Sequence, residues 1–248
     1  GDVYKRQHYI QRDRIMQEQI EVNYSKLDPV VINFISLELD KCRQHGIAIK
    51  MPFKKTVIHS GVKCAGYFES DPLEFAVAVG RSHKFWLNTF VHETCHIDQW
   101  REDLPVWYEK VNDEDPLDLM DAWIQGEITL DQASIKRMFD IVVEIELDCE
   151  KRSVEKIKQY NLPIKLDTYI RKSNAYVWSY RLLQVTREWD HTGAYECPDI
   201  WRKMPKHFDN DYSCLPEPIS KIFYSNIEQI TYICCLLYTS DAADDTPC

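Results

Sequence analysis

The segment His92–His96 carries two histidines four residues apart, with Glu93 directly after the first, in the pattern HExxH. On a helix, residues four apart lie on one face about one turn apart, so both imidazoles can reach one metal ion. Zinc lowers the pKa of a bound water to about 7, and a carboxylate beside it can take up the proton. The pattern therefore predicts a Zn²⁺ site with His92 and His96 as ligands and Glu93 as general base.

The residues around this motif favour a buried functional helix over a chance match on a surface helix. Phe90 and Val91 precede the motif and Ile97 follows it, within a helix predicted over residues 84–101. The strand-like segment 74–80, EFAVAVG, lies just upstream. An exposed strand in this position can pair with an extended peptide, so we expect EFAVAVG to bind substrate as an added strand.

A catalytic zinc needs a third protein ligand, and residue spacing narrows the choice. The metzincin pattern places a glycine three residues and a histidine six residues after the second motif histidine, where this chain has Gln99 and Glu102. The next histidine after His96 is His191. A carboxylate from a later helix is the remaining common ligand, and the helix predicted over residues 130–160 carries Glu144, Glu146, Asp148 and Glu150.

Helical periodicity separates these four acidic residues. An apolar stripe with Glu146 at its centre contains Ile135, Phe139, Val142, Cys149 and Ser153. A carboxylate in an apolar stripe is costly unless it is paired or bound to a metal, so Glu146 is the predicted third ligand. Glu144 and Asp148 face outward, but their ExxxD spacing keeps them as an alternative source of the third ligand. Glu150 could accept a hydrogen bond from a ligand histidine. Two alternatives stay open: Glu146 could pair with a core arginine instead of the metal, and Cys149 could be a metal ligand.

A peptidase also needs a hydrogen-bond donor for the oxyanion that develops during the reaction. The helix predicted to begin at Asp167 and to end near Trp189 places Tyr176 and Tyr180 on one side. Either hydroxyl could serve, although tyrosines at helical spacing more often pack in a core or at its rim.

The order of predicted elements indicates an α+β fold. Residues 8–26 are compatible with a helix, a second helix begins at Asp28-Pro29 and ends before Gly46, and residues 47–80 read as three or four antiparallel strands. Helices follow over residues 84–101, 117–124, 130–160 and 167–189, with a Thr129–Gln132 capping box and two shorter helices between 197 and 234. We expect one domain over residues 8–234, with a small antiparallel sheet before a mainly helical body.

Composition limits the function classes. The 248 residues are 44% hydrophobic and 28% charged, which is typical of a globular protein, and the 7 glycines do not favour glycine-rich phosphate loops. A net charge of −10 repels phosphate backbones, so we expect no nucleic-acid partner. The chain has no apolar run of the roughly 20 residues that span a bilayer, so no membrane partner is expected. The absence of a CxxC pair and an odd number of cysteines in residues 8–234 favour a reducing, cytoplasmic compartment.

The two ends of the chain read as translated sequencing adapter. Residues 1–7 are GDVYKRQ and residues 235–248 are CLLYTSDAADDTPC. One transposase-end sequence encodes DVYKRQ, and its reverse complement encodes CLLYTS. We therefore expect both segments to be non-native and the natural stretch to be a fragment of a longer reading frame.

The HExxH motif is followed later in the chain by a helix that carries carboxylates. This arrangement resembles the gluzincin type of zinc metallopeptidase, in a minimal zincin-like form. The stretches VHETCHIDQW, ELDCEKRSVEKIKQYNLPI and NAYVWSY are also similar to a protein family of marine bacteriophages. The resemblance covers residues 85–189 and implies Zn²⁺ held by His92, His96 and the matching glutamate, with Glu93 as base. For a phage-encoded protein the expected location is the host cytoplasm. Glu146 departs from the strict ExxxD spacing of gluzincins.

Three functional hypotheses follow. The first is a zinc-dependent peptidase that hydrolyses peptide bonds of a peptide or protein substrate through a metal-activated water, with Glu93 as general base. The second is a catalytically silent zincin-like phage structural or host-interaction protein that keeps a structural zinc. The third treats the motif as accidental and the chain as a helical binding module.

Overall fold

The computed structural model describes residues 18–226, apart from the side chains of residues 189–192. The predictions for the adapter-like segments 1–7 and 235–248 lie outside the described residues. The fold is α+β, as predicted. The chain divides between Glu93 and Thr94 into two compact units, and this boundary lies inside helix α3 (His83–Arg101). The assignment of residues 8–234 to a single domain stays a prediction.

In its described residues, 18–93, the first unit contains one long helix, six strands and the first turns of α3. Its elements before α3 are β1 (Glu18–Ile20), a 3-10 helix (Tyr24–Lys26), α2 (Pro29–Gln44), β2 (Ala48–Met51), β3 (Val57–His59), β4 (Val62–Cys64), β5 (Gly66–Ser70) and β6 (Leu73–Val77). Helix α2 begins where the sequence predicts, because the Asp28 side chain accepts a hydrogen bond from the Val30 amide. It ends before Gly46, which has φ +71°.

The sheet differs from the prediction in the direction of its strands. Its order is β1-β2-β6-β5, with β1, β2 and β6 parallel and β5 antiparallel to β6, while β3 and β4 form a separate hairpin. The prediction that all strands are antiparallel is therefore wrong. The helix-compatible stretch over residues 8–26 is also wrong at its described end, where β1 is a strand. Strand direction depends on pairing between distant segments, which local alternation does not encode.

The segment EFAVAVG is an inner strand, so the expectation that it binds substrate as an edge strand is wrong. Strand β6 pairs with β2 on one side and β5 on the other. Phe75, Ala76 and Val77 are fully buried, which suits a strand covered on both faces. Within the described part of the chain, β5 lies at the edge of this sheet.

The first turns of α3 are fixed within this unit by aromatic packing and by one glycine. Phe90 packs edge-to-face on Phe34 of α2 and Phe75 of β6, with ring centroids 5.8 Å and 5.5 Å apart. A Cβ atom added to Gly66 would lie 2.7 Å from Thr89 Cγ2 and 3.2 Å from Glu93 Cγ. Glycine at this position therefore allows β5 to approach the motif helix closely.

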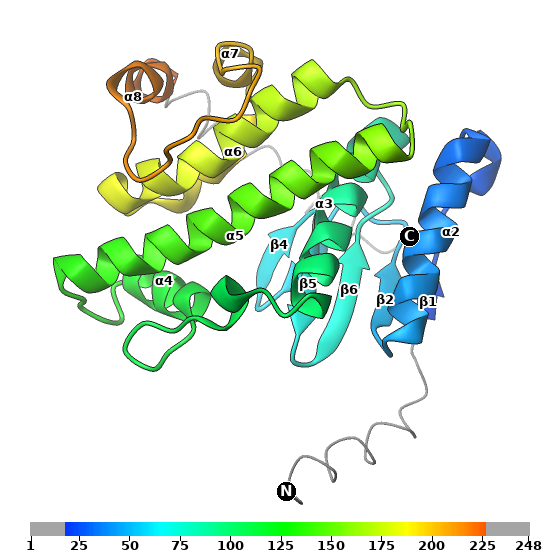
Figure 1. Cartoon of the computed structure of the whole chain (residues 1–248), viewed down its shortest axis with the longest axis horizontal. Helices are drawn as coiled ribbons and strands as arrows, with labels where there is room; N and C mark the ends of the chain where they lie inside the picture. Colours follow the sequence, from blue (N-terminus) through cyan, green and yellow to red (C-terminus); the bar gives the residue numbers. More distant parts are fainter. Residues whose placement is uncertain (1–17, 227–248) are drawn as a thin grey trace, which may run out of the picture. The chain divides into compact units, whose positions relative to one another are not determined.

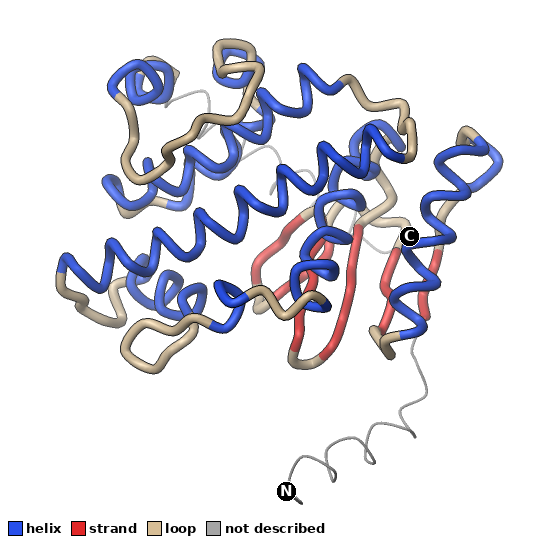
Figure 2. The backbone as a smooth tube through the Cα atoms, viewed as in Figure 1, coloured by secondary structure: helices blue, strands red, loops and turns tan. Residues whose placement is uncertain are grey.

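The second unit is helical (Figure 2). After the end of α3 its elements are a 3-10 helix (Pro105–Tyr108), α4 (Pro116–Gln125), α5 (Gln132–Gln159), α6 (Leu166–Thr186), a 3-10 helix (Trp189–Glu196), α7 (Pro198–Trp201) and α8 (Glu217–Tyr224). Helices α5 and α6 lie side by side as an antiparallel pair (Figure 1). Buried side chains such as Phe139, Val142, Trp178 and Leu182 fill the core around them.

The predicted helix boundaries are mostly confirmed, with two corrections. Helix α5 is capped by Asp131, whose side chain accepts from the Ser134 amide, so the Thr129–Gln132 capping box is wrong. Two acceptable N-cap residues, Thr129 and Asp131, stand two positions apart in the sequence, and the structure uses the later one. Helix α6 ends at Thr186, before Arg187 with φ +60°, and does not reach Trp189. None of the helices in the described range is long and apolar enough to cross a membrane.

Candidate metal centre

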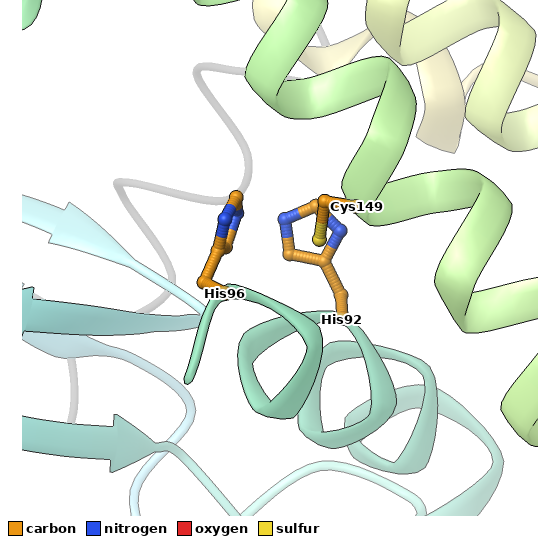
Figure 3. Close-up of side chains that lie close together, drawn as sticks. All are labelled: His92, His96 and Cys149. Carbon is orange, nitrogen blue, oxygen red and sulfur yellow. The ribbon is translucent and has the colours of Figure 1, made fainter. Parts of the chain in front are cut away.

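Helix α3 carries both motif histidines, as predicted. Together with Cys149 of α5, His92 and His96 form a group in which each side chain offers one ligand atom, and these atoms lie within 4.8 Å of one another. Figure 3 shows the two imidazole rings rising from α3 and the Cys149 thiol approaching them from α5. His96 and Cys149 are buried and His92 is half-buried. Imidazole and thiolate are typical zinc ligands, so this group could hold a metal ion.

Cys149 is the member of the group that sequence periodicity assigned to the core. Its side chain is fully buried, as a core cysteine would be, yet it also faces the motif histidines. Burial, and then the neighbouring Cys95, raise the pKa of the Cys149 thiol well above its usual value. Because a metal binds the thiolate, an ion that takes Cys149 as a ligand must displace a proton from it.

Glu146, the predicted third ligand, lies beside the same group. Its Oε2 is 3.7 Å from Nε2 of His96, and the side chain is buried. Two atoms bound to one tetrahedral zinc at 2.0–2.1 Å lie about 3.4 Å apart, so the observed separation needs only a small adjustment for both to bind one ion. The geometry is compatible with Glu146 as a ligand, and its assignment stays a prediction.

The two tyrosines considered as oxyanion donors lie near this carboxylate. The Tyr180 hydroxyl donates to Glu146 Oε1 at 3.3 Å, and the hydroxyls of Tyr176 and Tyr180 are 2.9 Å apart. Tyr180 is buried, so this hydrogen bond orients Glu146 in surroundings with little water. The role of either tyrosine toward an oxyanion stays a prediction.

The remaining acidic residues of α5 occupy three different environments. Glu144 is exposed, in agreement with its predicted place on the polar face. Asp148 is less outward than predicted, because it accepts hydrogen bonds from Gln99 and Arg152 at 2.9 Å and 2.6 Å. Glu150 is buried and accepts from the Ser173 hydroxyl at 2.6 Å. Ser173 is thus one donor to Glu150, and a hydrogen bond from a ligand histidine to Glu150 stays a prediction.

Glu93 is buried at the end of the first unit. A side chain at Gly66 would come within 3.2 Å of its Cγ, which places the carboxylate group close to strand β5. Burial, and the negative charge of Glu93, raise the pKa of the nearby Cys64 thiol to about 12. Cys64 is therefore a protonated, weakly nucleophilic thiol at neutral pH.

A buried lysine, which sequence reasoning did not single out, holds α5 against the later turns of α3. Lys156 Nζ donates to the Thr94 carbonyl and hydroxyl oxygens, both at 3.0 Å, and pairs with Asp98 at 2.8 Å. These contacts fix the helix that carries Cys149 and Glu146 relative to His96. Lysine is almost always exposed, so no local pattern indicated this role.

The third ligand can be identified by comparing two substitutions on α5. We expect Glu146→Ala to lower zinc affinity by more than the 10–100-fold typical of partners outside the coordination sphere. Cys149→Ala has the same effect if the thiolate also binds the ion. Isothermal titration with Zn²⁺ measures both. Glu144→Ala, an exposed carboxylate on the same helix, is the control and should leave affinity unchanged. A loss with Glu144→Ala and none with Glu146→Ala would move the ligand to the polar face.

The chain matches no protein-family model, no curated protein and no solved structure. The resemblance to gluzincins therefore stays a prediction that rests on the HExxH motif and the later carboxylate-bearing helix. Any functional conclusion depends on the chemistry of those side chains.

Proposed function

We propose that the protein is a zinc-dependent peptidase. The observation that carries this proposal is the group formed by His92, His96 and Cys149, whose ligand atoms lie within 4.8 Å of one another. A carboxylate directly follows the first histidine, and a second carboxylate, Glu146, lies 3.7 Å from the other imidazole. This set contains the ligands and the base that metal-assisted hydrolysis needs.

Each residue has a distinct role in the proposed reaction. When bound, zinc acts as a Lewis acid and makes water acidic enough to be a nucleophile at neutral pH. His92 and His96 hold the ion, with the third position filled from α5. Glu93 accepts the proton of the attacking water and delivers it to the leaving amine. Because Glu93 is buried, its carboxylate acts in surroundings that strengthen such proton transfers.

The proposed substrate is an extended peptide that pairs with strand β5. In the described part of the chain β5 has a strand partner on one side, β6, and its first residue, Gly66, approaches Glu93. Backbone hydrogen bonds to such an edge bind a peptide without regard to its sequence. A peptide added there would run past the general base. This placement replaces the expectation that β6 receives the substrate.

A second candidate function is favoured by the number of donors at the site. If Cys149 and Glu146 both bind the ion, they complete four protein ligands with the two histidines. Four protein ligands are typical of structural zinc sites, which leave no position for water or substrate. In that case the protein is a zincin-like structural or host-interaction protein without peptidase activity.

Metal content tests the basis of both candidates. We expect the purified protein to carry about one zinc per chain, because a site with three protein ligands binds the ion tightly. His92→Ala and His96→Ala should each abolish stoichiometric binding, as measured by plasma emission spectrometry after dialysis. His207→Ala, which changes an exposed histidine, is the matched control and should keep the wild-type content. Wild-type protein without zinc, or motif variants that retain it, would contradict the proposal.

A further inference from the structure

Gln99 lies three residues after His96 on α3 and is fully buried. Its Oε1 lies 2.8 Å from Nδ1 of His96. A side-chain amide has a donor end and an acceptor end of nearly the same shape, so its orientation follows from its hydrogen-bond partners. The hydrogen-bond partners of the other end of the Gln99 amide therefore decide whether its oxygen or its nitrogen faces His96.

The nitrogen end of this amide faces two groups that accept hydrogen bonds. Gln99 Nε2 lies 2.8 Å from the carbonyl oxygen of Ile145 and 2.9 Å from Oδ2 of Asp148. A backbone carbonyl and an ionised carboxylate do not donate, so the two amide protons point at them. The oxygen end therefore faces His96, and it can only accept. The imidazole proton consequently lies on Nδ1.

Asp148 is itself held in place, which makes the orientation of the amide firm. Arg152 Nε donates to Asp148 at 2.6 Å, and the same guanidinium pairs with Glu102 at 2.8 Å. The Asp148 carboxylate therefore accepts hydrogen bonds from both Arg152 and Gln99 and donates none. Hydrogen bonds in which one partner is charged are stronger than those between two neutral groups.

Protonation of Nδ1 places the lone pair of neutral His96 on Nε2. This is the nitrogen that lies 3.7 Å from Glu146 Oε2, on the side of the metal-ligand group. Without the Gln99 acceptor at Nδ1, the Glu146 carboxylate near Nε2 would favour the proton on Nε2. A protonated Nε2 cannot bind a metal ion.

We propose that Gln99 is a positioning residue that fixes the tautomer and orientation of His96, so that Nε2 is the atom offered to the metal. The inference rests on the proposed function for the identity of the ion. The tautomer is a property of the metal-free protein and can be measured by itself. Partners that orient a metal-ligating histidine in this way contribute 10–100-fold to metal affinity.

The tautomer is tested directly by ¹⁵N-detected imidazole spectra of the metal-free protein at pH 8, where a histidine of ordinary pKa is neutral. Comparison with His96→Gln identifies the His96 signals. We expect wild-type Nδ1 to carry the proton and Nε2 to be unprotonated. In Gln99→Leu, which offers no acceptor to Nδ1, the pattern should reverse.

A second measurement separates positioning from a general structural role. We expect Gln99→Leu to lower Zn²⁺ affinity by about 10–100-fold. Asp148→Ala is the matched control, because it removes the same helix-to-helix contact while the Ile145 carbonyl still orients the Gln99 amide. Its effect on zinc affinity should be much smaller, even if both variants lose stability.

Two results would overturn the proposal. One is a wild-type spectrum with the proton on Nε2, which needs no variant to fold. The other is an equal loss of zinc affinity in Asp148→Ala and Gln99→Leu. Failure of the proposed function gives a different result: the wild type shows the Nδ1–H tautomer but neither binds zinc nor cleaves peptides.

Discussion

Replacing Glu93 by glutamine is expected to lower the rate of peptide hydrolysis by about 10²–10⁴-fold while zinc stays bound. Glutamine has the shape of glutamate but cannot accept the proton of the attacking water at neutral pH. Glu93 is not a member of the His92, His96 and Cys149 group, so the metal affinity should not change. A quenched-fluorescence peptide library gives the rate, and emission spectrometry on the same samples gives the zinc content.

This pair of measurements distinguishes the two candidate functions. Glu144→Gln makes the same chemical change at an exposed position of α5 and should leave the rate unchanged. If wild type and Glu93→Gln bind zinc equally and neither cleaves any library member, the peptidase proposal is wrong and the structural role is favoured. If zinc is lost with Glu93→Gln, Glu93 contributes to the metal site itself.

Replacing Lys156 by methionine is expected to destabilise the protein by about 3–5 kcal/mol, the typical cost of removing one partner of a buried ion pair. The ammonium group is buried and is held by Asp98 and by two oxygens of Thr94. Methionine fills the space of the lysine stem but removes the closer of the two cations that pair with the Asp98 carboxylate, whose side chain is 15% exposed; Arg101 stays at 3.3 Å. Urea denaturation followed by circular dichroism measures the change.

An exposed pair on the same helix provides the control. Lys158 and Glu155 form an ion pair with side chains 51% and 71% exposed, so Lys158→Met should change stability by about 1 kcal/mol or less. The double variant Lys156→Met/Asp98→Ala should recover part of the loss, because the buried charge is then gone. A double variant that is less stable than Lys156→Met would show that the pair does not act as a unit.

Much of the helical architecture could be predicted from local patterns. The apolar spacing of α2, α4 and α5, together with the Asp28-Pro29 start of α2, marks these helices within a few residues, and the four-residue spacing of His92 and His96 locates the motif on α3. Such features depend on neighbouring residues, so the sequence contains the information directly. The wheel of α5 likewise separates buried Glu146 from exposed Glu144.

Contacts between distant segments could not be predicted in this way. The parallel pairing of β2 with β6 depends on a crossover that alternation does not reveal. The position of Gln99 just after the motif allows a supporting role at the site, but its partners on α5 are visible only in the fold. Cys149 fits the core pattern, so the sequence left its role as a ligand open, and the fold shows its thiol close to the two imidazoles.

Helix α5 places a carboxylate at position 146 and a thiol at position 149, three residues apart on the same face. One is a hard oxygen donor and the other a soft sulfur donor, and the rigid helix brings both to the imidazole pair. A metal ion that prefers oxygen ligands and one that prefers sulfur ligands would therefore each find a suitable donor at this site. We expect cobalt and copper to compete well with zinc here, so the supply of metals during synthesis would decide which ion is loaded.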